Sequence, residues 1–418
     1  MITLIEALSF RCLRYAHVPV RPFNVLVGPN ASGKTTFLDV LSFIKDTVSE
    51  GPTYAIRSRT DSIYDLFWQR EGKSFELAID VSIPSEVRTA LPEPRYDAIH
   101  YELKVGIHEG TGETGILGER VQLVNSTTQE SEQPSLFPRE VLPPAHIYEP
   151  GRRLSGKTVI HKVPEKNDNF YSEVLAAKGK GWLPSFKFGM QKSALGNLPD
   201  DGTRFPASTW LRSFLIEGVQ ALVLNSLLIR RPSSPGQPIA FKPDGSNLPW
   251  VIHRLQTDAP QKFEQWLEHV RTALPDIRGI KTIEREEDRH RFLVVEYQND
   301  VDVPSWMVSD GTLRFLALTL IAYLEDFEGV FLIEEPENGI HPSAVEPLFQ
   351  SLSSVYGAQV LIATHSPVIL GLVDLDSVLC FGTRDGATDI VRGSDHPALR
   401  DWQGEASLGV LFASGILG

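Results

Sequence analysis

The chain has 418 residues, a formal net charge of −13 at pH 7 and a hydrophobic share of 42%. These values are typical of two or three globular domains with sizeable cores. The acidic balance excludes a protein that coats nucleic acid through a generally basic surface, although a local basic patch is compatible with it.

The sequence also excludes several compartments and site types. It has no run of about 18 apolar residues that could span a membrane and no secretory signal pattern at its start. Its only cysteines are Cys12 and Cys380, too few for a disulfide framework or a cysteine-based zinc site. We therefore expect a cytoplasmic protein with two reduced thiols and no membrane partner.

The first 50 residues carry a phosphate-loop pattern, Gly-x-x-x-x-Gly-Lys-Thr. Apolar runs at 2–5, 17–20 and 23–27 predict strands before it, and apolar residues at helical spacing from Phe37 to Ile44 predict a helix after it. In such a loop, backbone N–H groups face phosphates, Lys34 reaches the β- and γ-oxygens, and the Thr35 hydroxyl holds Mg²⁺. The residues predicted to bind the nucleotide are Gly28, Pro29, Asn30, Ala31, Ser32, Gly33, Lys34, Thr35 and Thr36.

The middle of the chain divides by pattern into two regions. Alternating apolar residues at 75–81 and 101–105 predict an antiparallel β-lobe over 51–145, which ends in a polar, exposed loop at 125–144. Helical spacing over 206–228 and 248–274 predicts a mixed, largely helical insertion over 146–289. Lysines and aromatic residues interleave at 178–192, a pattern that can stack on single-stranded nucleic acid or form a partly buried loop.

Strands and helices alternate in the last third of the chain. The pattern predicts strands at 292–297, 330–333 and 359–363 and helices at 313–324 and 343–355. Such alternation implies a parallel sheet, so 290–395 and 1–50 together form the predicted core domain. The tail, 396–418, is unusually apolar, and it either packs on its own domain or docks into a partner.

Three further motifs in this region carry chemistry. Glu334 and Glu335 end an apolar strand, where Glu334 would bind Mg²⁺ and Glu335 would orient and deprotonate the attacking water. Ser309-Asp310-Gly311-Thr312 opens an apolar helix and makes an anion site, although an ordinary helix cap is the simpler interpretation of that motif alone. His365 follows the strand at 360–363, where it could hydrogen-bond a γ-phosphate.

In this order, the four motifs resemble the ATP-binding-cassette (ABC) ATPases of the RecF, SMC and OLD-like group. They resemble in particular the short bacterial "AAA family" predicted ATPases (AAA_21-like), many of which are found in anti-phage defence operons. The resemblance implies an α/β fold: a P-loop NTPase with an ABC-type ATPase head, a mostly parallel core sheet plus an antiparallel β-lobe, and an inserted α-helical region.

The resemblance also implies a head-to-tail homodimer that encloses two ATP molecules. The phosphate loop of one protomer would hold each ATP, and Ser309 and Gly311 of the other would cap it. His365 would be the switch histidine, and Glu337-Asn338 would lie in a loop that crosses the dimer interface. Gln69 is the candidate for the family's glutamine, which contacts Mg²⁺ and water. The metal set is therefore Thr35, Glu334 and Gln69.

Departures from the family pattern narrow the function. The signature reads Ser-Asp-Gly-Thr, Glu334 stands where Asp is more usual, no coiled coil follows the phosphate loop, and too few residues follow Pro367 for a TOPRIM nuclease domain.

We predict an ATP hydrolase with catalytic Glu335, His365 and Lys34. It would switch a separately encoded effector (a nuclease or toxin), DNA or RNA, in phage defence or DNA maintenance. The alternatives are a nucleotide-gated scaffold that silences such an effector and, less favoured, a transporter ATPase subunit.

Overall fold

The computed structural model describes residues 1–92, 96–126, 143–149, 156–174, 185–238, 240–324 and 327–400. Most of the predicted loop at 125–144, residues 178–184 of the basic aromatic stretch and the tail from 401 onward lie outside the described residues. Contacts divide the chain into two units. The first contains 1–21, 30–219 and 381–390, and the second contains 22–29, 220–380 and the residues from 391 on.

An antiparallel sheet of eight strands organises the first unit, in the order β2-β1-β4-β5-β6-β7-β8-β9. The strands predicted at 75–81 and 101–105 are confirmed as parts of β4 and β5. The bounds are β1 (Ile2–Phe10), β2 (Leu13–Pro19), β4 (Ser74–Ser82), β5 (Ala98–Ile107), β6 (Thr114–Val124), β7 (Gly156–Lys162), β8 (Asp168–Phe170) and β9 (Ser185–Phe186).

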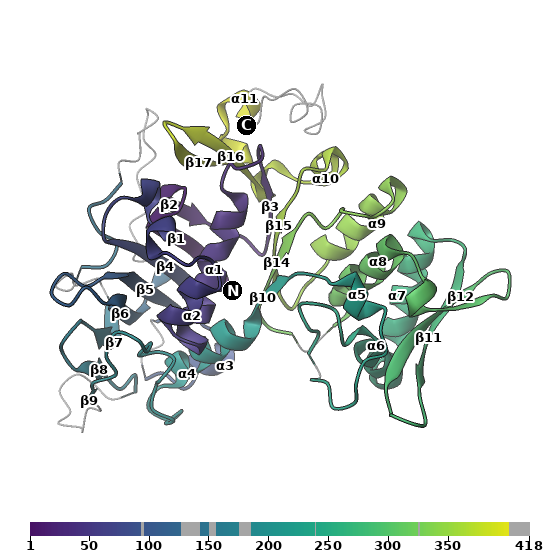
Figure 1. Cartoon of the computed structure of the whole chain (residues 1–418), viewed down its shortest axis with the longest axis horizontal. Helices are drawn as coiled ribbons and strands as arrows, with labels where there is room; N and C mark the ends of the chain where they lie inside the picture. Colours follow the sequence, from purple (N-terminus) through teal and green to yellow (C-terminus); the bar gives the residue numbers. More distant parts are fainter. Residues whose placement is uncertain are drawn as a thin grey trace. The chain divides into compact units, whose positions relative to one another are not determined.

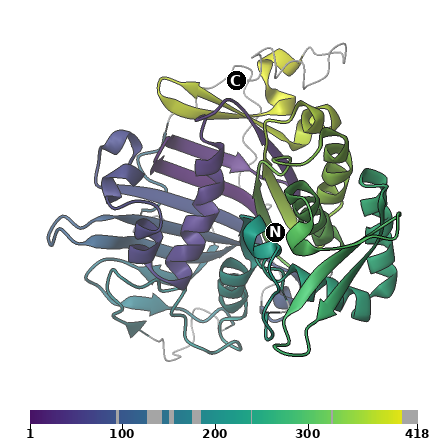
Figure 2. The same ribbon diagram turned by 45° about the vertical axis from the view of Figure 1, so that its right-hand side comes forward.

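Helix α1 (Lys34–Ser49) packs on one face of this sheet, as Figures 1 and 2 show. The Phe43 ring on α1 lies 5.7 Å from that of Phe10 on β1 and 5.2 Å from that of Phe75 on β4, centroid to centroid. These apolar contacts fix the helix that follows the phosphate loop. The shorter helices of the unit are α2 (Pro52–Arg57), η1 (Ile63–Leu66), η2 (Trp68–Arg70), α3 (Ser85–Arg88), α4 (Pro206–Ser213) and η4 (Phe214–Gly218).

The other face of the sheet carries buried charges. His100 on β5 lies between two carboxylates, with Nδ1 2.5 Å from Asp80 Oδ1 and Nε2 3.0 Å from Glu102 Oε1. Arg120 on β6 donates from Nε to Glu102 Oε2 at 2.7 Å, and the Tyr148 hydroxyl donates to the Lys162 carbonyl at 2.8 Å. All of these side chains are paired, as burial of charge requires.

Parallel strands organise the second unit. The sheet order is β10-β14-β15-β3-β16-β17, and β14, β15, β3 and β16 run parallel. This confirms the strands predicted at 23–27, 330–333 and 359–363. The bounds are β3 (Phe23–Val27), β10 (Val219–Leu222), β14 (Val330–Glu334), β15 (Gln359–Ala363), β16 (Val378–Arg384) and β17 (Ala387–Arg392). Of these residues, Val219 and 381–390 are grouped with the first unit.

The helices of the second unit include the three that follow the predicted motifs. These are α8 (Asp310–Leu320), α9 (Pro342–Ser353) and α10 (Pro367–Leu372). Trp266 on helix α7 (Pro260–Ala273) is fully buried in the core and donates from Nε1 to Thr319 Oγ1 on α8 at 3.0 Å.

The second unit also contains shorter helices and strands outside the parallel sheet. They are α5 (Ser226–Ile229), α6 (Leu248–Asp258), α7 (Pro260–Ala273), β11 (Ile277–Glu284), β12 (Arg291–Tyr297), β13 (Asp302–Pro304), η5 (Ser305–Met307), η6 (Ile321–Tyr323), η7 (Leu375–Ser377), η8 (Gly393–Asp395) and α11 (Pro397–Arg400). Among the described residues, no helix combines the length and the apolar character that crossing a membrane requires.

The helix predicted over 206–228 is wrong in its second half. Helix α4 ends at Ser213, one π-helical turn continues to Gly218, and residues 219–222 form strand β10. The backbone groups of β10 then pair in the sheet beside β14, which satisfies them as well as a helix would.

Candidate functional site

Three neighbouring strands of the second unit end at one edge of the parallel sheet. Register pairs Glu334 of β14 with Ala363 of β15, and Ala363 with Leu26 of β3. Because the carboxyl ends of parallel strands meet at the same edge, the segments that follow them gather there. The structure therefore brings together Glu334-Glu335, Thr364-His365 and Gly28-Pro29, as the sequence predicted for motifs far apart in the chain.

Glu335 is held in a defined position at this edge. Its backbone has a φ of 46°, in the left-handed region, and its N–H donates to the Ala363 carbonyl at 2.7 Å. Its Oε1 lies 3.8 Å from His365 Nε2, and its Oε2 accepts a hydrogen bond from Asn338 Nδ2. The carboxylate is still partly exposed, so water can reach it.

Glu337 links two of the loops in this cluster. Its Oε1 accepts from Thr364 Oγ1 at 2.5 Å and from the His365 N–H at 3.2 Å. Thr364 is fully buried, and its N–H donates to the Leu26 carbonyl of β3 at 3.1 Å. The sequence predicted only that Glu337 lies in a loop at a dimer interface. Apart from the spacing of the Glu-Pro-Glu run, no sequence pattern indicated that Glu337 would contact the loop that carries His365.

The start of α8 lies against the loop that begins at Glu335 and contains Gly339. Ser309 Oγ accepts from the Thr312 N–H at 3.2 Å, which is an ordinary helix cap, and both Ser309 and Asp310 are exposed. A Cβ added at Gly311 would clash with the Gly339 carbonyl oxygen. Glycine at 311 therefore allows the predicted signature to approach the loop that begins at Glu335.

The rest of the phosphate loop, from Asn30 on, belongs to the first unit. Ala31 and Gly33 have positive φ values of 62° and 101°, and a Cβ at Gly33 would clash with Thr388 Oγ1. Helix α1 begins at Lys34 without a side-chain cap or an acid in its first turn. Its first N–H groups therefore remain suited to an anion.

Ser32 supplies a separate indication that the loop fits a phosphate. Its Oγ is buried and has no hydrogen-bond partner among the residues that the structure describes. A buried hydroxyl without a partner is costly, and a phosphate oxygen would satisfy it. Lys34 is buried beside it and Thr35 is exposed. These residues fit the triphosphate of ATP, and the Thr35 hydroxyl fits a cation bound to that triphosphate.

Gln69 lies on η2 of the first unit. It is exposed, has a φ of 54°, and its Nε2 lies 3.9 Å from the position of a Cβ added at Gly386. The described residues contain no cluster of three His, Cys, Asp or Glu side chains suited to a metal ion. Mg²⁺ in nucleotide sites uses one or two protein ligands plus phosphate oxygens. The assignments of Thr35, Glu334 and Gln69 to Mg²⁺ therefore stay predictions.

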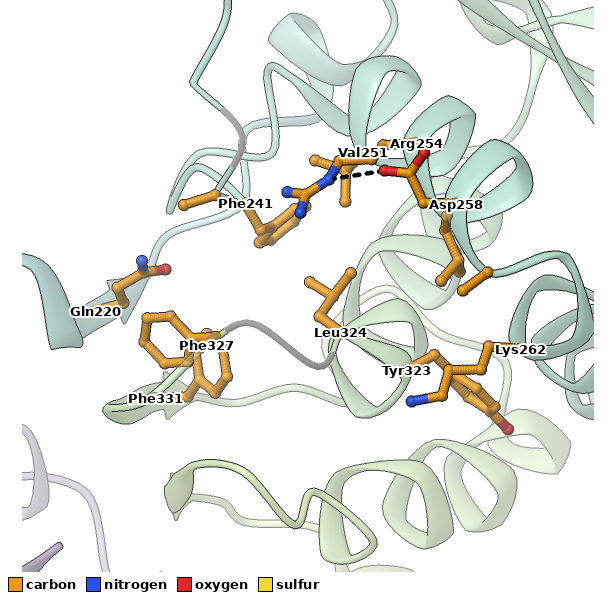
Figure 3. A pocket seen from close by; sticks show the side chains of 13 residues that line it. Gln220, Phe241, Val251, Arg254, Asp258, Lys262, Tyr323, Leu324, Phe327 and Phe331 are labelled. Atoms are coloured by element: carbon orange, nitrogen blue, oxygen red, sulfur yellow. Dashed lines mark hydrogen bonds and ion pairs between the residues drawn. The ribbon is translucent and has the colours of Figure 1, made fainter. Parts of the chain in front are cut away.

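A separate cavity of about 360 Å³ lies at the other end of β14 (Figure 3). The Phe327 and Phe331 rings stack at 4.3 Å on one side of it, and Arg254 and Asp258 form an ion pair of 3.3 Å on another. Its lining residues are Gln220, Ala240, Phe241, Val251, Arg254, Leu255, Asp258, Ala259, Lys262, Tyr323, Leu324, Phe327 and Phe331. None of the predicted site residues lines it.

Comparison of the structure with solved structures finds the heads of SMC proteins. An SMC head bound to the C-winged helix domain of ScpA matches with a TM-score of 0.52 and 13% identity, over 93% of this chain and 97% of that one. A second match is the Smc head domain with an extended coiled coil, bound to the C-terminal domain of ScpA derived from Pyrococcus furiosus. It has a TM-score of 0.51 and 13% identity, over 93% and 95%. At this identity the likeness shows the fold. No curated protein matches the sequence.

The sequence also matches a protein-family model, AAA_21, described as "AAA domain, putative AbiEii toxin, Type IV TA system", over residues 23–105 and 161–371. The predicted fold class and the resemblance to the RecF, SMC and AAA_21-like group are thereby confirmed. The matched segments contain the end of β3 and the edge residues Glu335 and His365. Because they make up well over half of the chain, this chain belongs to the AAA_21 family and is a nucleotide-binding ATPase with the fold of an SMC head.

Proposed function

We propose that the protein hydrolyses ATP as a head-to-tail homodimer. In this dimer, residues 28–36 of one protomer hold the nucleotide, and Ser309 and Gly311 of the other cap it. The contact that carries the proposal is the pair formed by Glu335 and His365, 3.8 Å apart at the carboxyl edge of the parallel sheet. Glu335 follows β14 and His365 follows β15, and β15 pairs with both β14 and β3, at whose end the phosphate loop starts.

The residues support a division of labour in hydrolysis. Glu335, oriented by Asn338, takes a proton from the water that attacks the γ-phosphate, and Lys34 stabilises the charge that develops on the phosphoryl oxygens. His365 contacts the γ-phosphate and responds to its loss. Thr35 and Glu334 would hold Mg²⁺, which would supply positive charge against the phosphates.

The test is Glu335→Gln, which keeps the shape of the side chain and removes the base. We expect ATP turnover to fall at least about 100-fold, while ATP binding persists and a dimer accumulates in light scattering. Glu328→Gln, at an exposed carboxylate just before β14, is the matched control and should hydrolyse ATP normally. Unchanged turnover in the Glu335→Gln protein would remove Glu335 from the mechanism.

We further propose that ATP binding and hydrolysis switch a separately encoded effector, a nuclease or toxin, or a nucleic acid, in phage defence or DNA maintenance. Purification with the neighbouring gene products would distinguish these partners. A stoichiometric protein complex supports an effector switch, whereas DNA- or RNA-stimulated ATPase activity of the isolated chain supports action on nucleic acid.

One observation favours the alternative of a slow, nucleotide-gated scaffold. Asp310 places an exposed carboxylate in the first turn of α8, between the two residues proposed to cap the γ-phosphate. A negative charge there opposes an anionic ligand. If turnover is slow for this reason, Asp310→Asn should raise it, and equal rates would count against the scaffold interpretation.

A further inference from the structure

The cavity at the start of β14 is walled by buried apolar side chains from several elements of the second unit (Figure 3). Phe241 lies before α6, Val251 and Leu255 lie on α6, and Phe331 lies on β14. The volume of about 360 Å³ falls within the range of about 300–1,000 Å³ that is usual for pockets that hold small molecules. A cavity with apolar walls is a poor site for water and a good one for an apolar ring.

One wall of the cavity is held in place by a buried asparagine. Asn247 is fully buried and donates from Nδ2 to the Ala240 carbonyl at 2.8 Å and to the Pro238 carbonyl at 3.2 Å. Its Oδ1 accepts from the Lys242 N–H at 2.9 Å. These hydrogen bonds fix the backbone on both sides of Phe241. A ligand would therefore meet a wall that is already ordered, which favours binding.

A single buried amide faces this apolar space from β10. Gln220 is 7% exposed, and its Oε1 has no hydrogen-bond partner among the residues that the structure describes. Figure 3 shows the amide pointing from β10 toward the space that the labelled side chains surround. A buried acceptor without a donor destabilises the fold, and an N–H or O–H group on a ligand would satisfy it.

The charged residues of the lining do not require a charged ligand. Arg254 and Asp258 pair with each other at 3.3 Å, and their side chains are 38% and 62% exposed. Lys262 is half-buried. Each of these groups is in contact with solvent or with an opposite charge. An uncharged ligand therefore fits the cavity better than an ionic one, because a buried charge needs a partner of its own.

From these observations we propose that the cavity binds a small, uncharged aromatic molecule that carries one N–H or O–H donor. The ring lies against the apolar walls, with Phe327 and Phe331 on one side, and the donor bonds to Gln220 Oε1. All the lining residues belong to one chain, and none is a predicted nucleotide, metal or signature residue. Binding at this cavity is therefore separate from the proposed ATP hydrolysis and from dimer formation.

The experiment uses the full chain and two naphthalene probes that differ in one group. The probes are 2-naphthol, which has an O–H donor, and 2-methoxynaphthalene, which has none. Binding is measured by calorimetry without nucleotide, so that the result does not depend on the proposed function. Gln220→Leu removes the acceptor and keeps a side chain of similar size. Gln256→Leu, at an exposed glutamine on α6 outside the lining, is the matched control.

We expect the unchanged protein to bind 2-naphthol about tenfold more tightly than 2-methoxynaphthalene, as the gain of one buried hydrogen bond implies. Gln220→Leu should remove this preference, and Gln256→Leu should keep it. The proposal is overturned if neither probe binds. It is also overturned if the unchanged protein binds both probes equally, or if Gln220→Leu keeps the preference.

A second variant tests whether the probes occupy this cavity. Leu324→Trp places a larger side chain in the cavity and should weaken the binding of both probes at least tenfold. Thermal unfolding shows whether this variant folds, and Ala259→Leu narrows the same cavity with a smaller change. If folded variants of both kinds bind the probes as the unchanged protein does, the probes lie elsewhere and the assignment of the cavity is wrong.

Discussion

At the scale of single residues, the contacts of Glu337 give this side chain a positioning role in the proposed reaction. Glu337→Ala removes the acceptor for a buried Thr364 hydroxyl and for the His365 N–H. Hydrogen bonds to a charged group contribute about 1.5–3 kcal/mol, so we expect kcat to fall about 10- to 100-fold with a smaller change in KM. Glu337→Gln keeps an acceptor oxygen and should recover most of the activity.

The control for this prediction is Glu346→Ala, which removes an exposed carboxylate on α9 and should leave kcat unchanged. A purely structural role for Glu337 would lower thermal stability and leave the activity of the folded fraction normal. That result, or equal effects of Ala and Gln on kcat, would contradict positioning of His365.

The sequence predicted some residues of the site and missed others for a physical reason. Phosphate binding requires a particular local backbone conformation, so Gly28–Thr35 can be recognised in the sequence as one short motif. Likewise Glu335 and His365 stand directly after apolar strands. Glu337 and Thr364 are 27 positions apart, and their contact depends on β14 and β15 being neighbours, which no local pattern encodes.

At the scale of elements, the buried charges on β4, β5 and β6 make stability depend on pH. Burial alone would lower the pKa of His100, but hydrogen bonds with Asp80 and Glu102 and the charges of these carboxylates raise it to about 10. The unfolded pKa is near 6.5. Because the folded state holds the proton more tightly, this contribution is complete below pH 6.5 and is lost as pH rises through about 10.

We therefore expect the unfolding temperature to decrease as the pH is raised from 6.5 to 10. The decrease should be smaller in the His100→Gln protein. The neutral variant should also be less stable at pH 6.5 by about 3–5 kcal/mol, because it removes the cation that lies between two buried carboxylates. His290→Gln, at a half-buried histidine between β11 and β12, should behave as the unchanged protein. A His100→Gln protein with the same pH profile as the unchanged one would contradict the assignment.

Elements whose apolar residues repeat with a clear period were predicted well. The burial of the polar side of β4 and β5, and the strand at 219–222, were not. The alternation over 75–81 and 101–105 predicted β4 and β5, but it also predicted strands buried on one side only. In the structure the polar side is buried too, because Glu102 and His100 are paired there. The helical spacing over 206–228 failed at residues 219–222, where pairing in the sheet outweighs helix periodicity.

At the scale of the whole molecule, contacts group segments that are distant in the sequence. Patterns along the chain predict a split core, 1–50 and 290–395, with a β-lobe at 51–145 and an insertion at 146–289 between its two parts. The contacts place 30–219 with 1–21 in one unit and 220–380 with 22–29 in the other. Strand β3 explains part of this grouping, because it pairs with β15 and β16, which follow it by more than 330 residues.

A ligand that the phosphate loop holds binds the folded chain and not the unfolded one, so it should stabilise the fold. A ligand at 100 times its Kd contributes about 2.7 kcal/mol, which corresponds to a rise of several degrees in Tm. We expect this rise when Mg²⁺-ATP is added to the Glu335→Gln protein, in which hydrolysis does not consume the ligand.

Lys34→Ala should abolish this rise in Tm, because the buried ammonium that pairs with phosphate is lost. Lys73→Ala removes an exposed lysine whose Nζ lies 3.0 Å from Glu109 and should leave the rise intact. An equal rise in all three proteins would mean that ATP stabilises the chain without using the phosphate loop, and the nucleotide would then have to be sought elsewhere in the fold.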